Sequence, residues 1–166
     1  MINDLGALKL KLKSIIKKFL ENDIKLIQKD AHKLALAFRF GLYLAEQFKN
    51  WDIDMEYNKR GNQKKRIMRG NKTRLFRPDL IVHKRTNDIN NLVNNYIILQ
   101  IKKNTSYELD SPQVNDDRES LKELTLNNGD YRYKLGILLY FYCKQDSTNY
   151  PYIEYYRNGE LIEREG

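Results

Sequence analysis

Three polar residues interrupt two short apolar segments of this chain at spacings that could do chemistry. Asp79 follows Pro78 at the head of Leu-Ile-Val, and Gln100 and Lys102 lie two residues apart in an otherwise apolar run. On a β-strand, side chains two residues apart point to the same side. If the two segments are neighbouring strands, an acid from one shares a patch with an amide and an amine from the other. Those groups can bind a cation and orient a water molecule.

The apolar periodicity predicts the elements that would position this patch. Helices are expected at 4–20, 30–49 and from 114 or 115 to about 126, and strands at 51–58, 77–83, 96–102, 133–143 and 152–156. Asp30 is expected to cap the second helix, and Asn158-Gly159 to form a hairpin turn. Segment 59–77 is expected to be a long loop or extended hairpin, and 86–95 a polar turn. The order α, α, β, β, β, α, β with a short β tail predicts an α/β fold.

Length and composition favour one domain in a reducing compartment. The 166 residues are expected to divide into a helical extension at 1–29, a core at 30–143 and a β tail at 144–166. The single cysteine, Cys143, cannot form an internal disulfide, and with only two histidines the chain cannot build a structural Cys/His zinc site. Apolar runs are too short for a membrane span, so the cytoplasm is the expected location.

Positive charge is concentrated in one segment of the chain. The formal net charge is +8, and no acidic residue occurs from Tyr57 to Arg77. Eight cations of this segment are predicted to contact nucleic acid: Lys59, Arg60, Lys64, Lys65, Arg66, Arg69, Lys72 and Arg74. Clustered cations favour phosphate backbones because binding releases counterions. High charge also serves solubility, which leaves that simpler explanation open.

The predicted N-terminal helix is amphipathic, with lysines opposite its apolar stripe. It is expected to pack on the domain itself, or to dock a second copy or another protein partner. A position on a membrane surface is the less favoured alternative, because no aromatic anchor accompanies the lysines.

Several segments, in order, resemble the PD-(D/E)XK nuclease superfamily and its small bacterial and phage restriction-like members. They are F-R-F-G-L-Y-L on the second predicted helix, D-M-E-Y-N-K, R-P-D-L-I-V-H-K-R and I-L-Q-I-K-K on the three successive predicted strands, then L-K-E-L-T and Y-R-Y-K-L-G. The resemblance covers most of 30–142. It implies a restriction-endonuclease-like αβββαβ core with a mixed central sheet flanked by helices.

The resemblance also assigns roles to the polar patch. Asp79 matches the metal-binding aspartate, Lys102 matches the lysine, and Gln100 stands where Glu or Asp is usual. Restriction enzymes of the methylation-dependent Mrr group carry Gln-x-Lys in this place. The implied cofactor is Mg²⁺ or Mn²⁺, held by Asp79, Gln100 and the carbonyl of Ile101.

A further acid would complete such a metal site. Glu56 on the polar face of the first strand is the first choice, and Glu46 near the end of the second helix is the next. Related proteins carry a helix glutamate near the position of Lys33, so that ligand is replaced here.

Two functions follow. The first is a metal-dependent nuclease acting on phosphodiester bonds, expected in DNA, with Asp79, Gln100, Lys102 and Glu56 as catalytic residues. The alternative is a catalytically degenerate protein of the same fold that binds nucleic acid or a protein partner. Each residue taken alone also has a structural explanation, such as a strand-start cap for Asp79 or a buried hydrogen bond for Gln100.

Overall fold

The computed structural model describes residues 2–60, 62–85, 92–144 and 150–166, so most of the polar turn predicted at 86–95 lies outside the described residues. Its helices are α1 (Ile2–Gln28), α2 (Lys33–Gln47) and α3 (Pro112–Thr125), with a short 3₁₀ helix, η1 (Leu92–Asn94). The main sheet contains β1 (Asp52–Met55), β6 (Leu80–His83), β7 (Asn95–Asn104), β8 (Leu135–Tyr142), β9 (Tyr152–Arg157) and β10 (Glu160–Glu165). Two small hairpins pair β2 (Lys59–Arg60) with β3 (Gln63–Lys64), and β4 (Arg66–Arg69) with β5 (Lys72–Leu75).

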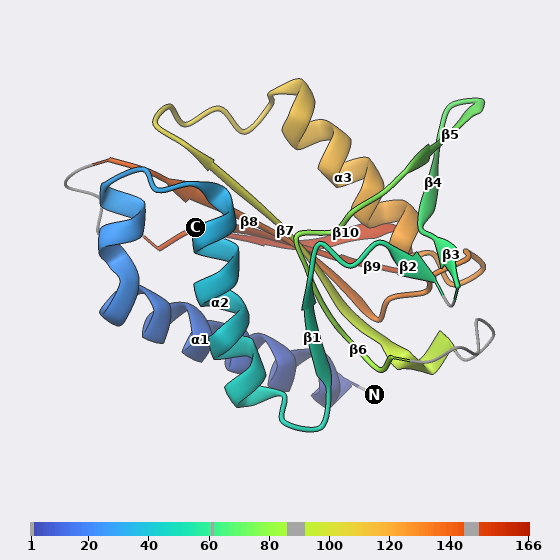
Figure 1. The fold of residues 1–166 in the computed structure, drawn as a ribbon, viewed down its shortest axis with the longest axis horizontal. Helices are drawn as coiled ribbons and strands as arrows, with labels where there is room; N and C mark the ends of the chain where they lie inside the picture. The colour runs from blue at the N-terminus through green and yellow to red at the C-terminus, as the bar shows by residue number, and fades with distance from the viewer. Residues whose placement is uncertain (1, 61, 86–91, 145–149) are drawn as a thin grey trace.

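The predicted α/β class is confirmed. The six strands lie in the order β1-β6-β7-β8-β9-β10, and only β7 and β8 run parallel within this described sheet. A parallel pair needs a crossover connection, and α3 supplies it. Figure 1 shows the sheet with α1 and α2 on one side of it and α3 on the other.

The alternation of side chains along β7 separates two cores. Ile97, Leu99 and Ile101 belong to the cluster that α1 and α2 cover, whereas Ile98 belongs to the cluster beneath α3. Gln100, at an even position like Ile98, therefore faces α3. An apolar run at a central strand is expected, because both of its faces are covered.

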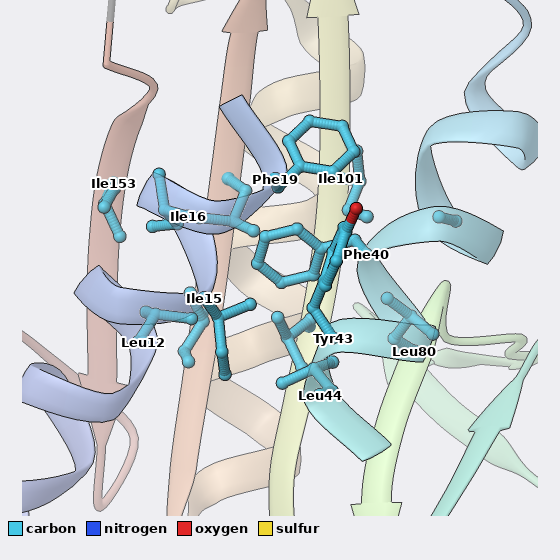
Figure 2. Packing of buried hydrophobic residues seen from close by; sticks show 14 of the residues in the cluster. Leu12, Ile15, Ile16, Phe19, Phe40, Tyr43, Leu44, Leu80, Ile101 and Ile153 are labelled. Atoms are coloured by element: carbon cyan, nitrogen blue, oxygen red, sulfur yellow. The ribbon is translucent and has the colours of Figure 1, made fainter. Parts of the chain in front are cut away.

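The apolar side of α1 packs inside this chain. Figure 2 shows Leu12, Ile15, Ile16 and Phe19 of α1 beside Phe40, Tyr43 and Leu44 of α2, with Leu80, Ile101 and Ile153 of the sheet. The helix is longer than predicted, because residues up to Gln28 continue it. The residues of its apolar stripe are buried in the core of this chain, so the stripe does not offer a docking surface to a second copy or partner.

Two local expectations were wrong. His32, not Asp30, caps α2, since its side chain accepts a hydrogen bond from Leu34 N, while Asp30 adopts φ 49° and pairs with Lys103. The first strand ends at Met55, because Glu56 adopts φ 48° and leaves the extended conformation. The final hairpin is as predicted: Asn158 and Gly159 both have positive φ between β9 and β10.

Candidate functional site

Asp79, the residue immediately before β6, lies beside Gln100 of the neighbouring antiparallel strand β7. The register of β6 and β7 pairs Leu80 with Leu99, which places Asp79 next to Gln100. The main-chain N–H of Asp79 donates to Gln100 Oε1 at 3.0 Å. The Asp79 carboxylate accepts a hydrogen bond through Oδ2 from the main-chain N–H of Ile101 at 2.7 Å. Both side chains are buried, so these contacts fix them in place.

A second carboxylate, Asp117 of α3, completes the group. Gln100 Nε2 donates to Asp117 Oδ1 at 3.3 Å, and Lys102 Nζ lies 2.8 Å from Asp117 Oδ2. Gln100 and Lys102 therefore point to the same side of β7, toward α3. Burial is the main cause that raises the pKa of Asp117, while the Lys102 ammonium opposes it. The negative charge of Asp79 also raises the pKa of Asp117, because the two carboxylates repel each other.

Lys33, at the first position of α2, contacts Asp79 from the side of the sheet opposite to α3. Its Nζ lies 2.7 Å from Asp79 Oδ1. The Asp79 side chain is only 10 % exposed, but that of Lys33 is 40 % exposed. Two ammonium groups, Lys33 and Lys102, thus neutralise two carboxylates, Asp79 and Asp117. We call these residues with Gln100 the polar cluster.

An open cleft adjoins the polar cluster. It has a volume of about 350 Å³ and is lined by Lys33, Lys102, Lys103, Asn104, Ser111, Gln113, Val114 and Tyr140. Ser111 caps α3 by accepting from Val114 N, so the positive end of this helix faces the cleft. The lysines of the cleft and the helix terminus make it suited to an anion.

The other predicted metal ligands do not join the polar cluster. Glu46 lies thirteen residues beyond Lys33 on α2, or about 20 Å along the helix, and pairs with Lys18. The Glu56 side chain is exposed and contacts Arg77 at 3.5 Å, although its main-chain N–H donates to Asp79 O. Ile101 contacts Asp79 through its N–H rather than its carbonyl.

A divalent metal ion does not fit the polar cluster as these residues are arranged. Both oxygens of Asp79 already have donors, and the amide oxygen of Gln100 is taken by Asp79 N. Mg²⁺ requires several free oxygen ligands. Within the described ranges, no three His, Cys, Asp or Glu residues form a group that could hold a metal. The ammonium of Lys33 supplies the positive charge beside Asp79 instead.

Some cations of the predicted nucleic-acid-binding segment already form ion pairs with acids of this chain. Arg69 contacts Asp116 at 2.9 Å and Glu123 at 3.2 Å, and Arg74 also pairs with Asp116. Arg60 lies 3.4 Å from Asp130. These cations are compensated within the chain, so they are less free for phosphates than the sequence indicated.

Lys65 is also unsuited to a surface contact. Its Nζ donates to the main-chain carbonyls of Tyr57 at 3.1 Å and Lys59 at 2.7 Å. Burial lowers its pKa to about 7, partly offset by the charge of Asp54. Lys59, Lys64, Arg66 and Lys72 are exposed and make no ion pair with any residue that the structure describes.

Sequence reasoning missed Asp117. The signal for it was available, because Asp117 falls three residues after Val114 and four before Leu121, on the buried side of α3. An acid on the apolar stripe of a helix needs a buried partner.

No family model, no curated protein and no solved structure matches this chain in the three comparisons. Among the described residues, no helix has the length and hydropathy to cross a membrane.

Proposed function

We propose that this protein binds nucleic acid on a restriction-endonuclease-like core whose reaction centre is held in a non-hydrolytic form by Lys33. The observation that carries this proposal is the 2.7 Å contact between Lys33 Nζ and Asp79 Oδ1, at the position where a metal-dependent site needs a free carboxylate. The succession α2, β1, β6, β7, α3, β8 has the order αβββαβ and supports the proposed core.

The charges around the polar cluster support nucleic acid as the partner. Lys33 and Lys102 face carboxylates on one side and the open cleft on the other. A phosphate that enters the cleft can accept from Lys102 without displacing a buried residue, and from Lys33 as well when Lys33 leaves Asp79. The exposed cations Lys59, Lys64, Arg66 and Lys72 form no ion pair with any described residue, so they can contact further phosphates.

Fluorescence anisotropy with a labelled 20-base-pair DNA duplex, a single strand of the same sequence and a matching RNA duplex tests the proposal. We expect binding that weakens linearly with log salt and has the same strength in EDTA and in Mg²⁺. Lys102→Ala should weaken binding, whereas Lys49→Ala, an equal change of charge on the exposed residue after α2, should not. Binding that ignores salt, or no binding to any of the three probes, contradicts the proposal.

A divalent-metal-dependent nuclease, acting on DNA, is the second candidate. It is favoured by the convergence of Asp79, Gln100 and Lys102 and by the exposure of Lys33, whose side chain is free to leave Asp79 on the solvent side. Incubation of the same probes with Mg²⁺ or Mn²⁺ separates the candidates. Cleavage that Asp79→Ala and Lys102→Ala both abolish would establish the nuclease, and intact substrate beside salt-dependent binding supports the first proposal.

A further inference from the structure

A two-stranded ribbon projects from the body of the molecule beside α3. We define the β4–β5 ribbon as Arg66 to Leu75, and Figure 1 shows it standing away from the main sheet. Its register pairs Arg66 with Leu75 and Met68 with Thr73. Because side chains alternate along each strand, these four residues share one face, and Ile67, Arg69, Lys72 and Arg74 share the other.

The inner face of the β4–β5 ribbon is attached to α3. Ile67 is buried in the cluster under α3, and Arg69 contacts Asp116 and Glu123. The main-chain N–H of Met68 donates to Glu123 Oε1 at 2.7 Å. Asp116 precedes Asp117 of the polar cluster, so the ribbon is anchored one residue away from it. These contacts attach the ribbon to α3, the helix whose first residues line the cleft.

The outer face of the ribbon is uncovered and carries an unusual mixture of side chains. Met68 is 51 % exposed and Leu75 is 55 % exposed, and they are diagonal neighbours across the two strands. Arg66 lies opposite Leu75, and Thr73 lies opposite Met68. The acids near the ribbon, Asp116 and Glu123, are paired with its inner face, so the outer face presents two apolar side chains, one hydroxyl and one cation, and no acid.

We infer that the outer face of the β4–β5 ribbon lies in the major groove of double-stranded DNA, with Met68 and Leu75 against base edges and Arg66 on a phosphate. This inference rests on the proposed function and identifies the duplex as its ligand. The major groove of B-DNA, about 12 Å wide, admits a two-stranded β-ribbon and exposes thymine methyl groups to apolar side chains. Strands of four residues span about 13 Å, the length of about four base pairs. The deep, narrow groove of duplex RNA excludes such a ribbon.

A double variant measures the apolar contact. Met68→Ser with Leu75→Ser should weaken binding to a thymine-rich 20-base-pair duplex by about tenfold and leave the salt slope unchanged. The matched control is Leu10→Ser with Leu42→Ser, which changes two exposed apolar residues on α1 and α2 and should leave affinity intact. Arg66→Ala should instead lower the salt slope by about 0.9. Circular dichroism melting checks that each variant is folded.

Replacing thymine by uracil in the duplex removes the methyl groups. This change should weaken wild-type binding but have little effect on the double Ser variant. If wild-type protein binds the RNA duplex but no DNA, the ribbon inference is overturned, and if it binds none of the three probes, the proposed function itself fails. If it binds DNA and the double Ser variant binds equally well, the ribbon inference is overturned while the proposed function stands. Concentration-dependent self-association that the double Ser variant loses, with unchanged DNA binding, would also overturn it, since the face would then be a protein interface.

Discussion

Removal of the Asp79 carboxylate should strengthen nucleic acid binding, which is the opposite of its effect in an enzyme that needs a metal ligand there. Lys33 Nζ is held 2.7 Å from Asp79 Oδ1, and its side chain already has access to solvent. In Asp79→Asn or Asp79→Ala the ammonium loses its partner and becomes available to a phosphate in the cleft. One additional phosphate contact raises the salt slope by about 0.9, which corresponds to about eightfold tighter binding at 0.1 M salt.

The two substitutions should differ in stability. Ile101 N–H is buried and donates to Asp79 Oδ2 at 2.7 Å. Asn keeps an oxygen acceptor for this group, whereas Ala leaves it unpaired at a cost of about 1–3 kcal/mol. Loss of the ion pair itself costs at most about 1 kcal/mol, because Lys33 is substantially exposed. Asp79→Ala should therefore unfold at lower urea concentration than Asp79→Asn.

The assay is anisotropy in EDTA across a salt series, with urea unfolding of the same preparations. Glu21→Ala is the matched control, since it removes one negative charge from an exposed position of α1. It should leave affinity and salt slope close to wild type. If Asp79→Asn binds no more tightly than wild type, Lys33 is not restrained by Asp79 in the way that the geometry indicates. Weaker binding by this variant would refute the reasoning outright.

Three other perturbations have defined outcomes. Lys33→Glu combined with Gln100→Glu replaces a cation and an amide by acids, so Mn²⁺ should raise the melting temperature of this variant and leave that of wild type unchanged. Glu154→Gln should cost about 3–5 kcal/mol in urea unfolding, because the buried Arg118–Glu154 contact at 2.8 Å loses its charge partner. Lys65 has a lower pKa folded than unfolded, so the unfolded chain binds more protons from about pH 7 to 10. Unfolding free energy should therefore rise with pH across that window, and the rise should be smaller in Lys65→Met.

The sequence was informative about the strands because their patterns are local. Alternation and Pro78 placed Asp79 at the start of β6, and the spacing of Gln100 and Lys102 put both on one side of β7. The strand order then followed from short connections and a single crossover helix. These features depend on neighbours in the chain, which is why periodicity reveals them.

The partners of the charged residues were not predictable in the same way. Arg69 and Asp116 are 47 residues apart in sequence, and Lys33 and Asp79 are 46 apart, yet each pair is in contact. A run of cations without acids therefore appeared free when α3 in fact neutralises part of it. Glu56 was expected on a polar strand face, but its positive φ ends the strand one residue earlier.

Basic side chains hold Glu154 in one way and the two carboxylates of the polar cluster in another, and the contrast explains why the polar cluster is the candidate site. Glu154 is fully buried and accepts from Arg118, Tyr152 and Tyr156, so its lone pairs are satisfied. The side chain of Arg118 is only 14 % exposed and makes two contacts with this carboxylate, so an incoming anion would have to break several hydrogen bonds to replace it. Lys33 and Lys102 instead line an open cleft, with side chains 40 % and 22 % exposed. A phosphate can replace a carboxylate as their partner while the carboxylates keep Ile101 N–H and the Gln100 amide as donors. Exchange of partners at little structural cost is the property that a binding site requires and a structural ion pair lacks.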